Sequence, residues 1–589
     1  MIEARFDDLT GVSDSFRLVA PVGVLEARRT SEVPGAIAAA EGAAARGLWV
    51  AGFVSYEASP GLDAAMSVRE RPSDDAFAQL PLAWFAMFED RERTVLPEPR
   101  EEAPQDTGAW RPSIERASYD AAIARIRSHI AAGDTYQVNH TLRLRSRVEG
   151  DDRGLYRDLC YAQRGAYSAY LNLGRYRVLS ASPELFFRLD GSQLTSKPMK
   201  GTARRGRWPA EDEAVAKSLR GSVKDRAENA MIVDLLRNDM GRVARAGSVT
   251  WSDVFDLERF ETVWQLTSTV SAELEPGTTL ADVFGALFPC GSVTGAPKVA
   301  TMRIIADLED SPRGVYCGAV GWLAPSGSGA VHARFNVPIR TVVLDAESRT
   351  AEYGVGGGIT WDSSAPSEYD ETLAKARVLT TRRPRFELYE TLRHDPGDGF
   401  RHLERHLTRL RLSSSYFGFS FDESAVIRAL EDAATRFADR AARVRVSVDR
   451  RGRVDAGATA LVLSPDPVGV AVDRGNPVDP TDPMLFHKHS LRGRYDDART
   501  RYPDADDVLL VNDRGEITES TIANVAVSLG GVWLTPPLEA GLLPGVGREV
   551  ALEEGWLIAA TVPDEDLQRA DAIELVSDVR GRRAVCLLD

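Results

Sequence analysis

Cysteine is scarce in this sequence: there are four residues among 589, and none belongs to a C-x-x-C pair. Disulfide frameworks and structural zinc sites need closely spaced cysteines, so neither is expected here. The N-terminal stretch "MIEARFDDLTG" is acidic and lacks an apolar run, which argues against a signal peptide. A reducing cytoplasm is therefore the expected location.

Long hydrophobic runs and excess positive charge are also lacking. The alanine-rich stretch near residues 36–54 is broken by Glu41 and Arg46, so it is too interrupted to span a bilayer. The formal net charge is −15 at pH 7, whereas nucleic acids and anionic membranes attract basic surfaces. We expect neither as a main partner. An anionic small substrate stays possible, because a few arginines in a pocket suffice to bind it.

Helical and strand-like patterns alternate throughout the chain, which predicts an α+β or α/β fold class. The proline-rich, charged segment 97–113 reads as a surface connection. A second boundary near residues 378–386 follows a helical stretch and precedes the strand-like "FELYETLRHD". The sequence thus predicts two domains, residues 1–380 and 386–589.

One lysine has an unusual setting in "LTSKPMKGTARRG" (residues 194–206). Pro198 stiffens the chain before Lys200, and Gly201 allows the backbone to turn after it. A surface lysine does not need such a frame. The setting therefore suggests that this amine is held in place for chemistry.

Three glutamates suggest a site for a hard cation. Glu368 and Glu371, in "SEYDETLAKA", are three residues apart and share one face of a helix. Glu228 lies in the helical stretch "SVKDRAENAMIVDLL" and, considered alone, is better explained as a surface charge. Carboxylates without histidine or cysteine nearby suit Mg²⁺.

Four clusters together resemble the chorismate-utilising family, which includes anthranilate, isochorismate, salicylate and aminodeoxychorismate synthases. They are "SASPELFFRLDGSQLTSKPMKGTARR", "SVKDRAENAMIVDLLRNDMGRV", "LFPCGSVTGAPKVATMRIIADLE" and "ARFNVPIRTVV" with "YGVGGGITWDSSAPSEYDETLAKA". The resemblance implies two stacked β-sheets flanked by helices. It also implies general acid/base work by Glu184 and Mg²⁺ binding by Glu228, Glu368 and Glu371. The residues implied to hold chorismate are Thr202, Gln265, Thr294, Tyr316, Arg340, Gly357 and Lys375.

Lys200 distinguishes among the members of that family. The anthranilate-type pattern has alanine before "GT", whereas aminodeoxychorismate synthases have lysine. The resemblance implies that Lys200 attacks C2 of chorismate, and that ammonia then adds at C4 and displaces it. Many relatives have histidine where this chain has Gln265, and glutamine cannot shuttle a proton, so loss of pyruvate in this domain is not expected.

The ammonia source is not visible in the sequence. A glutaminase would need a nucleophilic cysteine in a G-x-C-x-G elbow, and no cysteine here has that context. We expect a separate glutaminase subunit.

The second region contains an amphipathic helix, "HLERHLTRLRLSSSYFGF", whose Leu403, Leu407 and Leu410 should face inward. Arg409 flanks this apolar face, and by itself it is better explained as a solvated charge. "DVLLV", "NDRGE" and "ITESTIANVAV" suggest a hairpin. "LLPGVGRE" suggests a loop that opens a helix, which is a natural anion site.

These elements resemble the fold-type IV pyridoxal phosphate enzymes, which have two small α/β lobes and usually dimerise. The resemblance implies that Lys488 forms a Schiff base with pyridoxal phosphate and that Glu519 pairs with the pyridine nitrogen. It further implies that Arg409 and the backbone of Val546 and Gly547 bind the phosphate, and that Tyr495 contacts the ring oxygen. His489 replaces a threonine common in relatives.

Together, the two resemblances predict a bifunctional enzyme that aminates chorismate at C4 and then eliminates pyruvate to give 4-aminobenzoate. One alternative is an anthranilate- or isochorismate-type synthase joined to a branched-chain or D-amino-acid aminotransferase. Another is a degenerate scaffold that only recruits a glutaminase.

Overall fold

The computed structural model describes residues 2–11, 13–98, 107–326, 331–380, 384–437, 439–462 and 467–588. The chain forms two compact units. Unit 1 comprises Met1–Arg204 and Ala216–Pro384, and unit 2 comprises Arg205–Val215 and Arg385–Asp589. The short segment 205–215 thus belongs to unit 2, although the sequence analysis included it in the first domain. Residues 99–106 of the proline-rich connection lie outside the described residues.

Two ten-stranded sheets of antiparallel strands form the centre of unit 1. The strands of the first, in spatial order, are β16 (Gly295–Ala296), β8 (Gln137–Arg147), β20 (Thr350–Ile359), β19 (Thr341–Asp345), β10 (Tyr176–Ser182), β9 (Tyr167–Asn172), β1 (Glu3–Asp7), β2 (Phe16–Val19) and β6 (Glu92–Arg93), with β7 (Arg111–Pro112) paired to β8. Those of the second are β13 (Met199–Arg204), β15 (Val263–Glu273), β12 (Gln193–Lys197), β11 (Leu185–Asp190), β18 (His332–Asn336), β17 (Ala319–Ala324), β4 (Trp49–Val54), β5 (Ala83–Phe88) and β3 (Gly23–Ala27), with β14 (Thr250–Arg259) paired to β15.

Apolar side chains from both sheets share one buried cluster. Phe6 and Phe16 of the first sheet pack in it with Phe53 and Trp84 of the second. Burying the apolar faces of two sheets against each other is the main source of stability for such a pair. The stacked-sheet architecture expected from the sequence is therefore confirmed.

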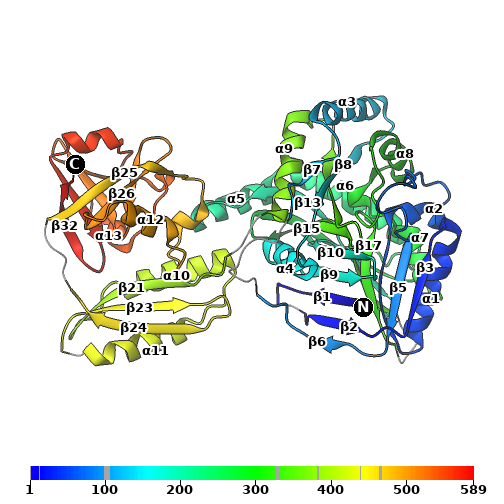
Figure 1. Cartoon of the computed structure of the whole chain (residues 1–589), viewed down its shortest axis with the longest axis horizontal. Helices are drawn as coiled ribbons and strands as arrows, with labels where there is room; N and C mark the ends of the chain where they lie inside the picture. The colour runs from blue at the N-terminus through cyan, green and yellow to red at the C-terminus, as the bar shows by residue number, and fades with distance from the viewer. Residues whose placement is uncertain are drawn as a thin grey trace. The chain divides into compact units, whose positions relative to one another are not determined.

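Helices flank these sheets, and α1 lies along β3 and β5 in Figure 1. Helix α3 ends before Gly133, whose φ of 82° is the left-handed conformation typical of a glycine C-cap. The α-helices of this part of the chain are α1 (Val33–Ala45), α2 (Ser59–Leu62), α3 (Arg116–Ala132), α4 (Asp152–Gln163), α5 (Pro209–Gly221), α6 (Val223–Gly241), α7 (Leu280–Leu287), α8 (Lys298–Leu308) and α9 (Ala365–Ala376).

Unit 2 has two lobes, as expected. The smaller is a four-stranded sheet, β22 (Gly399–Phe400), β21 (Leu388–Asp395), β23 (Ala442–Val448) and β24 (Val454–Ala460), packed against α10 (Leu403–Phe417) and α11 (Glu423–Ala434) (Figure 1). The larger is an eight-stranded sheet, β27 (Ile517–Ser520), β26 (Asp507–Asn512), β25 (Val468–Val478), β32 (Gly581–Leu587), β31 (Ala572–Ser577), β28 (Asn524–Leu529), β29 (Val532–Thr535) and β30 (Ile558–Ala559). Its helices are α12 (Gly493–Arg501) and α13 (Val546–Glu553).

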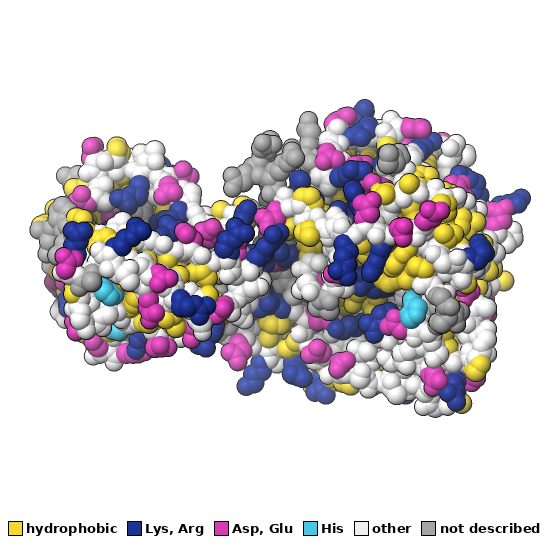
Figure 2. All heavy atoms as spheres, turned by 90° about the horizontal axis from the view of Figure 1, so that it is seen from below, with side chains coloured by type: hydrophobic (Ala, Val, Ile, Leu, Met, Phe, Trp, Pro, Cys, Tyr) yellow, Lys and Arg dark blue, Asp and Glu magenta, His cyan; other side chains and the backbone are white. Residues whose placement is uncertain are grey.

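Acidic and basic side chains are interspersed on the face of the molecule shown in Figure 2. Of the helices in the described part of the chain, none has the length and apolar character needed to cross a bilayer.

Candidate active sites

Lys200 lies on β13, the edge strand of the second sheet of unit 1. The following residue, Gly201, has a φ of 95°, but it lies inside β13, where the pairing with β15 shifts register, so the structure has a bulge in a strand and not the predicted turn. Asn229 donates a hydrogen bond to the Lys200 carbonyl at 3.1 Å, and Lys200 Nζ lies 3.6 Å from Glu228 Oε2. Because Glu228 and Asn229 both belong to α6, this helix positions the backbone and the amine of Lys200.

The glycine-rich end of β20 lies directly against this lysine. A Cβ atom on Gly358 would be 2.7 Å from Lys200 Nζ and 2.8 Å from Gln137 Nε2. Gln137 is fully buried, and in the described structure neither atom of its amide has a hydrogen-bond partner. An unpaired buried amide is costly unless a ligand satisfies it, so Gln137 is a candidate substrate contact. The sequence analysis missed it because a single glutamine after a helix forms no pattern.

Glu184 is the buried acid of this site. Burial raises its pKa to about 7, although the hydrogen bond from Ser292 and the charge of Lys200 oppose the shift. Ser292 Oγ donates to Glu184 Oε1 at 2.6 Å. A carboxyl group with this pKa can release and regain a proton near neutral pH, which is what a general acid requires.

Lys375 and Arg340 place two cations beside the glycine strand. Lys375 Nζ lies 2.7 Å from Glu371 Oε1 and donates to the Gly356 carbonyl at 3.1 Å. Burial lowers the pKa of Lys375, and this effect is larger than the opposite effect of the Glu371 carboxylate. For Glu371, the neighbouring Lys375 outweighs the effect of burial, so the pKa of Glu371 is lowered. Arg340 donates to the Lys375 carbonyl. The two side chains can therefore act together on a carboxylate.

The three glutamates expected to bind Mg²⁺ do not form a ready metal centre. Glu228 faces Lys200 and Glu371 faces Lys375, so lysine ammonium groups occupy the positions that a cation would take. Glu368 Oε2 lies near Gly357, 3.6 Å from where its Cβ would be. Within the described residues no group of three or more acidic, histidine or cysteine side chains is placed to hold a metal. Two of the three carboxylates thus pair with lysines in this arrangement, and Mg²⁺ binding stays a prediction.

Gln265 supports the strand that carries Lys200. Thr202 donates from Oγ1 to Gln265 Oε1 at 2.8 Å, and Gln265 Nε2 donates to the Gly201 carbonyl at 2.9 Å. Both the oxygen and the nitrogen of the Gln265 amide are thus hydrogen-bonded to residues of β13. Gln265 and Thr202 were expected to bind substrate, and that role stays a prediction.

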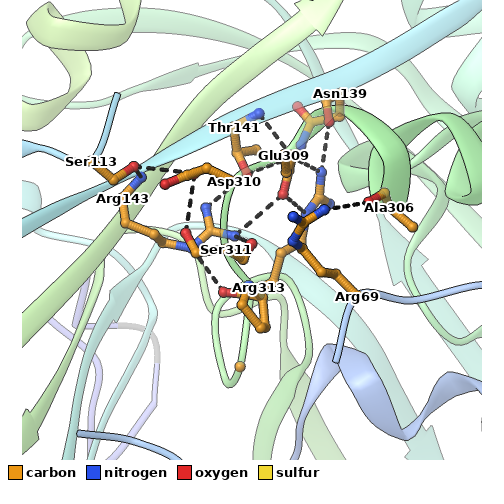
Figure 3. A network of polar contacts seen from close by, with 12 residues as sticks. Arg69, Ser113, Asn139, Thr141, Arg143, Ala306, Glu309, Asp310, Ser311 and Arg313 are labelled. Atoms are coloured by element: carbon orange, nitrogen blue, oxygen red, sulfur yellow. Dashed lines mark hydrogen bonds and ion pairs between the residues drawn. The ribbon is translucent and has the colours of Figure 1, made fainter. Parts of the chain in front are cut away.

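A buried ionic network supports the other side of the site (Figure 3). Glu309 Oε1 lies 2.6 Å from Arg313 Nη2, and Glu309 Oε2 lies 3.3 Å from Arg143 Nη2. Arg313 also donates to the Val293 carbonyl at 2.6 Å, next to Thr294. The Arg143 guanidinium lies over the Tyr316 ring, 5.3 Å from its centre. This network fixes the surroundings of Thr294 and Tyr316, two residues expected to hold chorismate.

Unit 2 contains a cavity of about 460 Å³ between its lobes, and Lys488 lines it. Burial lowers the pKa of Lys488, and its Nζ lies over the Tyr389 ring, 5.2 Å from the centre. At one end of the cavity, Tyr495 donates to Glu519 Oε1 at 2.8 Å and the Leu543 amide donates to Oε2 at 3.2 Å. Burial raises the pKa of Glu519 to about 7, so this carboxyl can share a proton with a ring nitrogen.

The cavity also contains an anion-binding end. Arg409 lines it and is largely buried, with Glu390 Oε2 at 2.7 Å, so the expectation of a solvated charge was wrong. Periodicity placed Arg409 beside the apolar face, but it could not show the buried Glu390 on β21 that pairs with it. The first residues of α13, Val546 and Gly547, line the same end. A Cβ atom on Gly547 would lie 2.8 Å from the Asp578 amide nitrogen, so the backbones meet closely here.

This donor set suits pyridoxal phosphate: a lysine, a carboxyl for the ring nitrogen, and an arginine with a helix N-terminus for the phosphate. His489, which replaces a threonine common in relatives, makes hydrogen bonds to nearby backbone groups. Its Nδ1 accepts from the Leu491 amide at 3.1 Å, and its Nε2 lies 3.0 Å from the Met484 carbonyl. His489 therefore holds the loop after Lys488.

Comparison with known proteins agrees with this geometry. The profile of the chorismate binding enzymes matches residues 9–381. The chain belongs to this family. The amino-transferase class IV profile matches residues 387–588, so the chain joins a chorismate-binding part to a fold-type IV domain.

Among the relatives, the aminodeoxychorismate synthase of Streptomyces griseus is 41% identical over 336 residues, covering 55% of this chain and 46% of that protein. Aminodeoxychorismate synthase component 1 of Klebsiella aerogenes is 41% identical over 274 residues, covering 46% of this chain and 59% of that protein. The chain thus spans about half the length of these curated relatives. Anthranilate synthase component I from Streptococcus pneumoniae TIGR4 is similar in structure, with a TM-score of 0.55 and 25% identity over 63% of this chain and 93% of that one.

Proposed function

We propose that this chain is a bifunctional enzyme that converts chorismate and ammonia into 4-aminobenzoate and pyruvate. One observation carries the proposal: two separate lysines, both only partly exposed, each in a different reactive setting. Lys200 lies beside Glu228 and the glycine strand of a chorismate-binding unit. Lys488 lines a cavity suited to pyridoxal phosphate in a class IV domain.

In the proposed first reaction, Lys200 Nζ forms a bond to C2 of chorismate, both ring double bonds shift (C1=C2 to C1=C6 and C5=C6 to C4=C5), and the hydroxyl at C4 leaves. Glu184, whose pKa is about 7, gives the leaving hydroxyl a proton so that it departs as water. Ammonia then bonds to C4 while the bond between C2 and Lys200 breaks, which restores the lysine. A proton from the new amine returns to Glu184, and the product is 4-amino-4-deoxychorismate. Lys375 and Arg340 orient the carboxylates of the substrate.

The second reaction uses the cavity of unit 2. Pyridoxal phosphate, when bound, supplies an electron sink for the electron pair that a departing proton leaves behind. Lys488 has a lowered pKa, so it can accept the proton from C4 of the ring. Pyruvate leaves from C3 with the electrons of the broken C–O bond and a proton, and the ring becomes aromatic. Arg409, Val546 and Gly547 hold the phosphate end, and Glu519 holds the ring nitrogen.

We further propose five properties that the sequence suggests. The ammonia comes from a separate glutaminase, since the Klebsiella aerogenes relative is named component 1. Mg²⁺ joins Glu228, Glu368 and Glu371 only together with substrate, because lysines face two of these carboxylates without it. The protein is cytoplasmic, serves folate synthesis or a related use of 4-aminobenzoate, and dimerises through unit 2.

The test is a product assay with the full chain, chorismate, an ammonium salt and pyridoxal phosphate, with and without Mg²⁺. We expect 4-aminobenzoate and equimolar pyruvate. Lys200→Ala should form neither product from chorismate yet convert supplied 4-amino-4-deoxychorismate normally. Lys488→Ala should accumulate 4-amino-4-deoxychorismate.

Other products would point to the alternatives. Anthranilate or a salicylate would contradict the assignment of unit 1, and transamination of an amino acid would contradict that of unit 2. If the wild-type chain consumes no chorismate at any Mg²⁺ concentration, the scaffold alternative holds.

A further inference from the structure

Residues 205–215 belong to unit 2, although the chain on both sides of them belongs to unit 1. In sequence they follow β13, the strand of Lys200. A buried ion pair ties the loop 205–208 to the first turn of α5, which starts at Pro209: Arg205 Nη2 lies 2.6 Å from Asp212 Oδ2, and both side chains are more than nine-tenths buried. There is no space for a side chain at Gly206, where a Cβ atom would lie 2.2 Å from the Asp212 nitrogen.

This loop packs against α10 through Tyr416. The Tyr416 hydroxyl donates to the Gly206 carbonyl at 2.7 Å, and Arg205 donates to the Tyr416 carbonyl at 3.1 Å. The Arg205 guanidinium lies over the Tyr416 ring, 4.2 Å from its centre. A buried tyrosine satisfied in this way has one fixed orientation.

The fixed ring of Tyr416 in turn supports His487, the residue before Lys488. The ring centres of Tyr416 and His487 are 4.4 Å apart, and those of Phe417 and His487 are 4.7 Å apart. Ser413 Oγ lies 2.9 Å from His487 Nδ1. Burial lowers the pKa of His487 to about 3, so this ring stays neutral and acts as a packing element.

The loop also contacts Phe486, two residues before Lys488. Trp208 lies against Phe486 with ring centres 4.9 Å apart, and it joins the apolar cluster that includes Tyr495. Arg207 donates to the Pro480 carbonyl at 3.3 Å. The loop therefore contacts the chain on the N-terminal side of Lys488 directly at Phe486 and Pro480, and it reaches His487 through Tyr416.

We propose that residues 205–215 are a positioning element of the lysine site in unit 2, which is therefore incomplete without a segment from the middle of the chorismate-binding sequence. Trp208 acts through Phe486, and Arg205 acts through Tyr416 and His487. Both hold the backbone of Lys488 so that its amine points into the cavity. Neither touches the substrate or the cofactor. The inference rests on the proposed cofactor site, but not on the reaction performed there.

The test uses the full chain with Trp208→Ala, the conservative Trp208→Phe, and Trp533→Ala as a matched control. Trp533 packs on Trp556 in another part of unit 2. In the cofactor-free protein, hydrogen exchange of the peptide spanning residues 484–492 should quicken at least tenfold in Trp208→Ala, but not in Trp533→Ala or Trp208→Phe. In the cofactor-loaded protein, the pH midpoint of the absorbance band of the Lys488 Schiff base should shift only in Trp208→Ala.

Two results would overturn the inference: unchanged exchange and midpoint in Trp208→Ala, or equal changes in Trp208→Ala and Trp533→Ala, which would indicate general destabilisation. Arg205→Ala should repeat the effect, and Arg205→Lys should restore part of it. These readouts need no substrate. A failure of the proposed reaction would appear instead as normal spectra and exchange without formation of 4-aminobenzoate.

Discussion

Gly358→Ala tests how tightly the Lys200 amine is confined. The added methyl group would lie 2.7 Å from Lys200 Nζ and 2.8 Å from Gln137 Nε2, closer than real Cβ contacts allow. To reach ordinary contact, the amine must retreat by roughly 0.7 Å. Both colliding atoms are ends of flexible side chains, so the fold should lose only about 1 kcal/mol.

Catalysis should suffer much more than stability. A displacement approaching 1 Å at a reacting atom costs on the order of 100-fold in rate, because the attacking geometry is lost. We therefore expect Gly358→Ala to lower the amination of chorismate by about 100-fold. Conversion of supplied 4-amino-4-deoxychorismate should stay unchanged, because Lys488 is not affected.

Gly285→Ala, in α7, is the matched control. Its Cβ would lie 3.9 Å from the Leu62 carbonyl oxygen, which is ordinary van der Waals contact. Steady-state rates of both reactions, measured on the same preparations, decide the matter. If Gly358→Ala aminates chorismate within about twofold of the wild type, Lys200 is not confined as described or is not the nucleophile.

Three other substitutions test the remaining parts of the two sites. Ser292→Ala removes a hydrogen bond that lowers the pKa of Glu184, so this pKa should rise. The decrease in amination rate above about pH 7 should then move to higher pH, as measured in pH–rate profiles at constant free ammonia. If the decrease stays at the same pH, Glu184 is not the acid. Glu519→Gln should retain pyridoxal phosphate, seen by absorbance, yet lower the lyase rate by about 100-fold because the ring nitrogen loses its charged partner; full activity would contradict the assigned orientation of the cofactor. Glu309→Gln leaves Arg143 and Arg313 without their shared carboxylate and should destabilise unit 1 by about 3–5 kcal/mol in urea unfolding. The pKa of Glu309 is lowered to about 2 in the folded state. The contribution of Glu309 to the free energy of unfolding is therefore fully present above the ordinary carboxyl pKa and is lost as the pH falls toward 2. The variant should not show this pH-dependent loss of stability.

The sequence predicted those features that depend on local patterns. Leu407 and Leu410 of α10 are buried, as their spacing predicts. The strands β26 and β27 pair as a hairpin. Turn chemistry and periodicity depend on near neighbours in the chain, so such features can be inferred without knowing the fold.

The features that the sequence could not predict depend on long-range contacts. Arg409 pairs with Glu390, which lies 19 residues earlier on another element. Gln137 becomes a site residue only because β8 and β20 are neighbours and Gly358 leaves space beside it. Residues 205–215 contain no motif that would assign them to unit 2, and their partners lie more than 200 residues further along the chain.

The position of residues 205–215 in the chain also has a consequence for the order of folding. The ribosome makes Gly206 before Tyr416, its partner 210 residues later. At about 5–20 residues per second, the segment waits roughly 10–40 s for that partner. Trp208 and the Arg205–Asp212 pair must meanwhile be kept from wrong contacts, while unit 1 assembles on both sides of them. Unit 2 therefore completes its folding on a segment whose two ends continue into unit 1, and residues 385–589 reach their final form only by finding that segment.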